Sequence, residues 1–326
     1  MNKTYIIAEI GVNHNGSYKI AIDLVKKAKI AGADAVKFQM YELEANYNKK
    51  ETSKKTLEWS NKLKLTTKDF IRINNYCNEN KIEFISSIFD EKSLQKYLKL
   101  KPKIIKIPSS EVYNFKLIDE IQKTNLKVIF STGITDLNEI KEIKKKLQKK
   151  QTIRHKKLKD NLYCLYCVSK YPTRYEDVDL LNIDIIKNKC KIKTGFSDHT
   201  KGIEAAIIAA FLGVPIIEKH IKIDDNHNCP DEKVSITYED FKKMVSGIRI
   251  AEKISLNKSI DKNNIDFTKK GFYAKEKINI NTKIKKEFLI MQKPNLSSDL
   301  KIDDIVGKKT KFEIKKEAPI NKKNII

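Results

Sequence analysis

The segment YIIAEIGVNHNGSYKIAIDLVKKAKIAGADAVKFQ, residues 5–39, contains a complete unit of strand, helix and strand. Residues 5–10 and 35–39 are short runs rich in β-branched and other apolar side chains, which is typical of buried strands. Between them, residues 17–31 form a longer amphipathic stretch with apolar side chains at helical spacing. This segment therefore indicates an α/β fold in which strands and helices alternate.

The same alternation continues as far as residue 254. We expect further strands at 83–88, 103–107, 127–131, 162–168, 192–197 and 215–220, and further helices at 67–81, 90–99, 114–124, 136–150, 178–188, 202–212 and 237–254. Eight strands, each followed by a helix, in about 250 residues predict a (β/α)8 TIM barrel. An open doubly wound sheet gives a similar alternation, but residues 11–16 read GVNHNG and lack its Gly-rich turn.

Three other segments differ from this pattern. Residues 40–66 form a long polar connection, which we interpret as a lid or substrate loop, and residues 221–236 form a shorter irregular one. We expect the barrel domain to span residues 1–255, a polar linker to span 256–265, and a small β-rich domain to span 266–326. That last segment carries 16 Lys and 8 acidic residues, so it is more basic than the rest of the chain.

The composition limits the class of protein. The net charge is +24, but only four of the 66 basic residues are Arg, the side chain best suited to phosphate recognition, so a nucleic-acid role is disfavoured. Five cysteines without a secretory signal indicate free thiols in a cytoplasmic protein, and no apolar run is long enough to cross a membrane. Cys164 and Cys167 form a C-x-x-C spacing on a predicted strand, where they would face opposite sides.

Polar side chains end nearly every predicted strand. In a TIM barrel these positions share one rim, where active sites lie. Lys37 and Lys106, together with the hydroxyls of Ser87, Ser109, Ser131, Ser169 and Ser197, suit a ligand that carries a phosphate and a carboxylate. His199 and His220 end adjacent strands and suit a divalent metal, and Glu9 is a candidate acid or base.

Five motifs in order extend this interpretation. The segments IAEIGVNHNG (7–16), ADAVKFQ (33–39), CVSKYP (167–172), GFSDHT (195–200) and IEKH (217–220) closely resemble the sialic acid (N-acetylneuraminate) synthase family. That family includes the legionaminate and pseudaminate synthases. The resemblance covers essentially the whole chain, and the C-terminal part is similar to the antifreeze-like SAF domain of this family.

The resemblance implies condensation of phosphoenolpyruvate with an N-acylated hexosamine, such as N-acetylmannosamine or a di-N-acetylated trideoxy hexose. The product is a nine-carbon 2-keto-3-deoxy acid, and phosphate is released. The resemblance also implies that His199 and His220 bind Mn²⁺ or Mg²⁺, and that the chain forms a homodimer whose SAF domain reaches over the partner's barrel. The implied phosphoenolpyruvate contacts are Lys37, Ser87, Lys106, Ser109, Ser131, Ser169 and Ser197. The implied sugar contacts are Glu9, Gln39, Glu111, Tyr171 and Asp231, with Phe267 and Lys293 closing the partner's site.

The chain departs from the family pattern at several positions near the sugar. It has SSIF at 86–89, SSE at 109–111 where Ser-Gly-Glu is usual, CPD at 229–231 where Gly-Pro-Asp is usual, and Lys293 where Arg is usual. Because Ser87 keeps its hydroxyl, these departures concern the identity of the sugar more than the reaction. A phosphoenolpyruvate-dependent synthase of C7 or C8 keto acids on the same barrel, and a basic polyanion-binding protein, are the alternatives.

Overall fold

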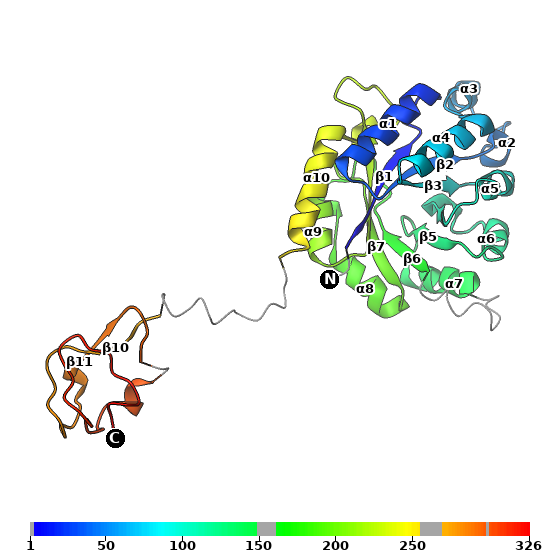
Figure 1. Cartoon of the computed structure of the whole chain (residues 1–326). Coiled ribbons are helices and arrows are strands. Elements are labelled where there is room, and N and C mark those ends of the chain that lie inside the picture. The colour runs from blue at the N-terminus through cyan, green and yellow to red at the C-terminus, as the bar shows by residue number, and fades with distance from the viewer. Residues whose placement is uncertain (1–2, 149–160, 255–268, 298–299) are drawn as a thin grey trace. The chain divides into compact units, whose positions relative to one another are not determined.

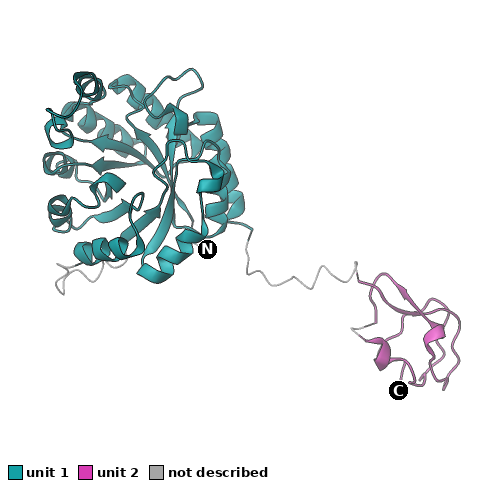
Figure 2. Cartoon of the chain, turned by 180° about the vertical axis from the view of Figure 1, so that it is seen from behind, with its two compact units in different colours: residues 1–255 teal, residues 256–326 magenta. Residues whose placement is uncertain are grey.

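The computed structural model describes residues 3–148, 161–254, 269–297 and 300–326. The chain divides into two compact units, Met1–Ser255 and Leu256–Ile326, which we call unit 1 and unit 2 (Figure 2). The linker predicted at 256–265 and Phe267 lie outside the described residues.

Eight parallel strands close into a barrel in unit 1, because β1 pairs with both β2 and β8 (Figure 1). The predicted (β/α)8 fold is therefore confirmed. A short strand, β9 (Ile236–Thr237), pairs with the end of β8. The barrel strands are β1 (Tyr5–Gly11), β2 (Ala35–Met40), β3 (Glu83–Ile88), β4 (Ile104–Ile107), β5 (Lys127–Ser131), β6 (Leu162–Tyr166), β7 (Lys193–Asp198) and β8 (Ile216–Lys222).

Helices surround the barrel, and several begin where a side chain satisfies free backbone N–H groups. Ser17, Asp90 and Thr237 accept hydrogen bonds from the first turns of α1, α5 and α10. α1 ends at Gly32, which adopts a left-handed conformation that few other residues tolerate. The helices are α1 (Tyr18–Ala31), α4 (Thr67–Glu79), α5 (Glu91–Leu98), α6 (Phe115–Ile121), α7 (Leu137–Gln148), α8 (Leu181–Cys190), α9 (Glu204–Phe211) and α10 (Tyr238–Ala251).

Several predicted boundaries differ from the observed ones by two or three residues, and a side-chain contact accounts for two of these differences. The strand predicted at 162–168 ends at Tyr166, because the Cys167 amide donates to Thr132 Oγ1 at 3.2 Å instead of continuing the strand. The helix predicted at 178–188 begins at Leu181, whose amide donates to Asp179 Oδ1 at 3.0 Å. In both places a side-chain acceptor outcompetes the regular backbone pattern.

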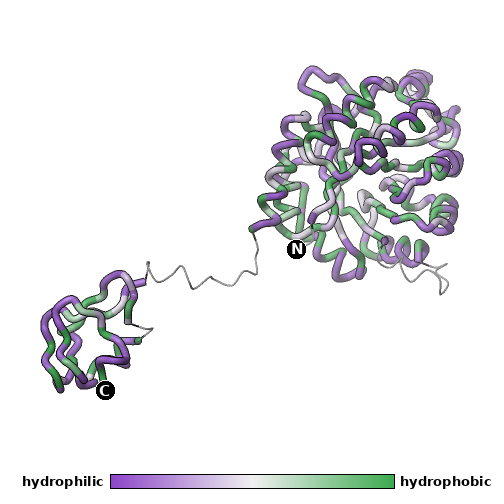
Figure 3. The backbone as a smooth tube through the Cα atoms, viewed as in Figure 1, coloured by the Kyte–Doolittle hydropathy of each residue, from purple (hydrophilic) through white to green (hydrophobic). Residues whose placement is uncertain are grey.

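The apolar core of unit 1 has two parts. The larger part fills the space between the strands and the helices. In Figure 3, hydrophilic and hydrophobic residues alternate along most of these helices, whereas α9 is largely hydrophobic. The smaller part fills the barrel interior and consists of Ile7, Ala35, Ile85, Ile104, Ile129, Leu165 and Ile216. These apolar side chains fill the interior toward the amino ends of the strands. The polar side chains of the strands therefore lie at the carboxyl ends.

The connection predicted at 40–66 is not wholly irregular. It contains two short helices, α2 (Leu43–Asn46) and α3 (Lys54–Lys62). Glu42 anchors its beginning through ion pairs with Lys64, at 2.9 Å, and with Lys96. Its end lies against the β1–α1 loop so closely that a Cβ atom on Gly16 would lie 2.0 Å from the Lys62 carbonyl oxygen. The insertion therefore packs as an ordered part of the rim.

Unit 2 has a small core of its own with little regular secondary structure. β10 (Gly271–Ala274) pairs antiparallel with β11 (Leu289–Gln292), and isolated bridges join several further segments. Its buried apolar residues are Phe272, Ala274, Ile278, Ile284, Leu300, Ile305, Ile314, Ile320 and Ile325. Within the described ranges of both units, no helix is long and apolar enough to cross a membrane.

Candidate active site

A polar cavity of about 300 Å³ lies at the carboxyl ends of the barrel strands. Most of the predicted site residues line it, although they come from all eight barrel strands or the loops after them. The predicted residues in its wall are Glu9, Lys37, Gln39, Ser87, Lys106, Ser109, Ser131, Tyr171, Ser197, His199, His220 and Asp231. The structure thus brings together residues more than two hundred positions apart in the sequence.

Two buried lysines occupy the centre of this cavity. Lys37 Nζ lies 2.7 Å from Glu9 Oε2 and donates a hydrogen bond to Ser87 Oγ at 2.8 Å. Lys106 Nζ lies 3.6 Å from Glu218 Oε1, and the second oxygen of the same carboxylate lies 3.7 Å from Lys37 Nζ. Each lysine residue is about 3% exposed, so neither is a surface charge.

Burial and charge act differently on each member of this network. Burial raises the pKa of Glu9 to about 7, although Lys37 opposes that rise. Burial alone would also raise the pKa of Glu218, but Lys106 and Lys37 outweigh it and lower the pKa to about 2. Burial lowers the pKa of Lys106. Burial acts in the same direction on Lys37, but the charges of Glu218 and Glu9 outweigh it and raise the pKa of Lys37. The two carboxyl groups therefore have different protonation behaviour, which is typical of acid–base sites.

Hydroxyl groups form one wall beside these lysines. Ser197 donates to Glu218 Oε1 at 2.8 Å, while Ser131 Oγ is buried and has no hydrogen-bond partner. Gly133, after β5, lets this wall close, because a Cβ atom there would lie 2.4 Å from Ser109 Cβ and 2.5 Å from Ser169 Oγ. A buried hydroxyl without a partner is costly unless a ligand accepts from it, so this wall is suited to an anion.

The two histidines lie beside each other at the ends of β7 and β8. Their ring centroids are 5.6 Å apart, and Tyr171 covers His199 at a centroid distance of 4.2 Å. His199 Nδ1 lies 2.8 Å from the Val168 carbonyl oxygen, so this nitrogen carries the proton and Nε2 keeps its lone pair. Burial lowers the pKa of both rings, for His220 well below its usual value, so both are neutral.

Neutral imidazoles with one free nitrogen each are suitable metal ligands. The described residues contain no group of three or more His, Cys, Asp or Glu side chains that could hold a metal ion. This donor set fits an ion that takes its remaining ligands from water or substrate. Asp231 Oδ2 lies 3.4 Å from His220 Nδ1, and burial raises the pKa of Asp231 to about 6.

Asp231 comes from the connection predicted as irregular at 221–236. Its amide donates to Asn13 Oδ1 at 3.0 Å, and Asn13 Nδ2 donates to the Ile221 carbonyl oxygen at 2.9 Å and to Ser235 Oγ at 2.8 Å. Asn13 is completely buried. It therefore fixes this loop to the end of β8 and places Asp231 over the cavity.

Four predicted site residues lie elsewhere. Ser169 does not line the cavity, and its Oγ lies next to Gly133. Glu111 accepts hydrogen bonds from Ser110 Oγ and Asn114 Nδ2 and does not line the cavity either. Lys293 belongs to unit 2, and Phe267 lies outside the described residues.

The sequence reasoning missed several lining residues, of which Glu218 is central. Glu218 and His220 are two positions apart on β8 and so share a face, a signal that could have identified Glu218. Phe89, Pro108 and Cys167 also line the cavity, whereas Cys164 packs in the outer core. The prediction that the two cysteines face opposite sides is confirmed.

Comparison with known proteins assigns this arrangement to a family. Residues 24–260 match the NeuB family. The chain belongs to the NeuB family. It is 33% identical to an N,N'-diacetyllegionaminic acid synthase of Campylobacter jejuni over 94% of this chain and 96% of that protein. It is 30% identical to a pseudaminic acid synthase of the same species over 96% of this chain and 94% of that one.

Solved structures agree with this NeuB assignment. The crystal structure of N-acetylneuraminic acid synthetase from Leptospira borgpetersenii superimposes with a TM-score of 0.74 at 28% identity, covering 80% of this chain and 90% of that one. Deoxyheptulosonate phosphate synthase from Thermotoga maritima, at 14% identity and a TM-score of 0.58, shares the fold alone.

Proposed function

We propose that this chain is a nonulosonic acid synthase that condenses phosphoenolpyruvate with an N-acylated hexosamine and releases phosphate. The observation that carries the proposal is the pair of buried lysines facing a wall of hydroxyls within a NeuB-family barrel. Lys37 and Lys106 supply two positive charges to one small cavity, as a ligand with a phosphate and a carboxylate requires. Ser87, Ser109, Ser131 and Ser197 supply hydrogen-bond donors beside them.

The other wall of the cavity is suited to the sugar. Tyr171, Gln39 and Asp231 offer an aromatic face and polar groups for hydroxyl and acylamino substituents. His199 and His220 would hold a divalent ion, Mn²⁺ or Mg²⁺. When bound there, such an ion supplies Lewis-acid polarisation of the sugar aldehyde.

Proton transfer falls to Glu9. The enol carbon of phosphoenolpyruvate attacks the aldehyde, water adds to the resulting cationic carbon, and the C–O bond to phosphate breaks. Water addition releases a proton, and Glu9, with a pKa raised to about 7 by burial, is suited to accept it near neutral pH. Lys37, at 2.7 Å, holds the Glu9 carboxylate toward the centre of the cavity.

The relatives favour a di-N-acetylated acceptor. The matches to the legionaminic and pseudaminic acid synthases extend over 94–96% of this chain, whereas the match to the human N-acetylneuraminate-9-phosphate synthase covers 76%. An alignment over 94% of the chain also includes most of unit 2. This supports a SAF domain in unit 2. As a further part of the proposal, that domain brings Lys293 and Phe267 to the partner's site in a homodimer.

Phosphate release tests the reaction. Purified protein is incubated with phosphoenolpyruvate, Mn²⁺ and a panel of mono- and di-N-acetylated hexosamines, and phosphate and 2-keto acid are measured. We expect both products in equal amounts, only with an N-acyl acceptor, and none after chelation. Four- and five-carbon sugar phosphates in the panel test the C7 and C8 alternative. Absence of product with every N-acyl hexosamine at saturating Mn²⁺ contradicts the proposal.

A further inference from the structure

A buried ion pair lies behind the two histidines, on the outer face of the same strands. β7 and β8 pair with Asp198 opposite Lys219. Because His199 and His220 line the cavity and side chains alternate along a strand, Asp198 and Lys219 point the other way, toward the surrounding helices. Both side chains are completely buried. The cavity residues described above do not use this pair.

The contacts of the pair enclose His199 on both sides along the chain. Lys219 Nζ lies 3.0 Å from Asp198 Oδ2 and also donates to the Thr200 carbonyl oxygen. Asp198 Oδ1 accepts from the Thr200 amide at 2.8 Å. The residues immediately before and after His199 are therefore tied to one ammonium group, which leaves the His199 backbone little freedom.

The same turn also holds the loop after β6. The His199 carbonyl oxygen accepts from the Thr173 amide at 2.9 Å, and the His199 ring hydrogen-bonds to Val168. Tyr171, between these two contacts, covers His199. A shift of the Asp198–Thr200 turn would therefore move both the imidazole and the loop that carries Tyr171.

Stability alone does not explain a charged pair at this place. Two charges removed from water lose hydration, and well-packed apolar side chains of similar size commonly give equal or greater stability. What apolar side chains cannot supply is a directional contact to both sides of one residue.

We propose that Asp198 and Lys219 are positioning residues, which fix His199, between Asp198 and Thr200, and His220, next to Lys219, so that both imidazoles meet one divalent ion. The inference rests on the metal site of the proposed function. Removal of groups that hydrogen-bond directly to metal ligands lowers metal affinity by about 10–100-fold in other metal sites, and we expect an effect of this order from this pair.

Mn²⁺ binding tests the inference directly. Free Mn²⁺ is titrated by electron paramagnetic resonance against the wild type, Lys219→Met, and the double variant Asp198→Asn/Lys219→Met, with thermal unfolding measured in parallel. Lys219→Met leaves a buried carboxylate without a cationic partner, so we expect a lower Tm. The double variant removes both charges, so we expect Tm to recover, while the Mn²⁺ Kd stays about 10–100-fold above the wild-type value.

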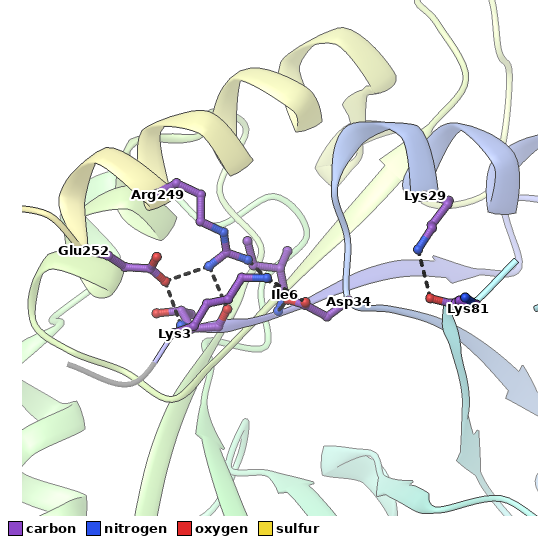
Figure 4. A network of polar contacts seen from close by, with 8 residues as sticks. Lys3, Ile6, Lys29, Asp34, Lys81, Arg249 and Glu252 are labelled. Carbon is purple, nitrogen blue, oxygen red and sulfur yellow. Dashed lines mark hydrogen bonds and ion pairs between the residues drawn. The ribbon is translucent and has the colours of Figure 1, made fainter.

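A second ion network at the other end of the barrel supplies the control (Figure 4). Arg249 pairs with Glu252 at 2.7 Å and with Asp34 at 3.3 Å, and donates to the Thr4 carbonyl oxygen at 2.9 Å. We expect Arg249→Met to lower Tm without changing the Mn²⁺ Kd. Phosphoenolpyruvate binding without metal should stay within about twofold of the wild type in all variants.

The outcomes separate the inference from the proposed function. A double variant that regains both Tm and wild-type Mn²⁺ affinity overturns the inference, because the pair is then only structural. Equal loss of Mn²⁺ affinity in Arg249→Met and Lys219→Met also overturns it. If the wild type makes product and binds Mn²⁺ while the double variant binds it equally well, the inference fails and the proposed function stands. A wild type that binds no Mn²⁺ overturns the inference together with the metal site.

Discussion

Replacement of Gly133 by alanine tests whether the hydroxyl wall binds phosphoenolpyruvate. Gly133 has φ of +46°, a conformation that costs other L-residues about 1–2 kcal/mol. The added Cβ would also lie 2.4 Å from Ser109 Cβ and 2.5 Å from Ser169 Oγ, and such overpacking costs about 1–3 kcal/mol. We therefore expect Gly133→Ala to lower the free energy of unfolding by about 2–5 kcal/mol.

The effect of Gly133→Ala on phosphoenolpyruvate binding follows from the side chains that the added Cβ atom displaces. An added Cβ atom cannot be accommodated at these distances, so Ser109 and Ser169 must move from their present positions, and Ser109 lines the cavity. A hydrogen bond to a charged group contributes about 1.5–3 kcal/mol, and about 1.4 kcal/mol is a factor of ten in affinity. Loss of one such contact predicts a rise of at least tenfold in the KM for phosphoenolpyruvate, with a smaller change for the sugar.

Gly32→Ala is the matched control. Gly32 also has a positive φ, of +92°, but it ends α1 and its added Cβ would meet only Val245 at 3.1 Å. We expect a loss of about 1–2 kcal/mol from urea unfolding and an unchanged KM. Steady-state phosphate release at varied phosphoenolpyruvate measures both variants. If Gly133→Ala has the KM of Gly32→Ala, the hydroxyl wall does not bind this substrate and the reasoning is wrong.

Three further predictions concern other parts of unit 1. Burial raises the pKa of Asp231 from 3.8 to about 6, so the free energy of unfolding should fall, by about 3 kcal/mol at most, as pH rises from about 4 to 6. Asp231→Asn should remove this pH dependence, which urea unfolding at each pH measures. An unchanged pH dependence would place the titration elsewhere. Arg249→Met should lower the free energy of unfolding by about 1–3 kcal/mol, because Asp34 and Glu252 lose their shared partner, while kcat stays unchanged; a fall in kcat would contradict this. Ser110 lines the cavity, so Ser110→Gly removes a hydroxyl there, and the KM for the sugar should change by about threefold or more while that for phosphoenolpyruvate stays constant. Equal changes in both KM values would show a general distortion.

The strands and the rim were predictable because they depend on local pattern and one rule of the fold. The runs at 83–88 and 127–131 coincide with β3 and β5, since apolar residues bounded by polar ones define buried strands. Parallel strands in a closed barrel then bring their carboxyl ends together, so Lys37 and Lys106 could be grouped with His199 and His220. That grouping needed no knowledge of side-chain contacts.

The pairing inside the site was not predictable in this way. Glu218, Lys219 and His220 are consecutive, and their separate roles depend on which side chains face the cavity. Lys219 pairs with Asp198 behind the wall, whereas Glu218 bridges the two lysines of the cavity. A one-residue change of register would exchange these roles, so the three-dimensional structure was needed to assign them.

The large net charge of the chain does not describe its site. Within the cavity, three carboxyl groups, of Glu9, Glu218 and Asp231, face only two ammonium groups, of Lys37 and Lys106. An anion therefore binds only by taking hydrogen bonds and charge contacts that the lysines already share with Glu9 and Glu218. A single carboxylate gains little from such an exchange, whereas a phosphate and a carboxylate on one rigid molecule can engage both lysines and the serine wall at once. Under the proposed function, the internal carboxylates hold the lysines in place before substrate arrives, and they favour an anion with two charged groups over one with a single carboxylate.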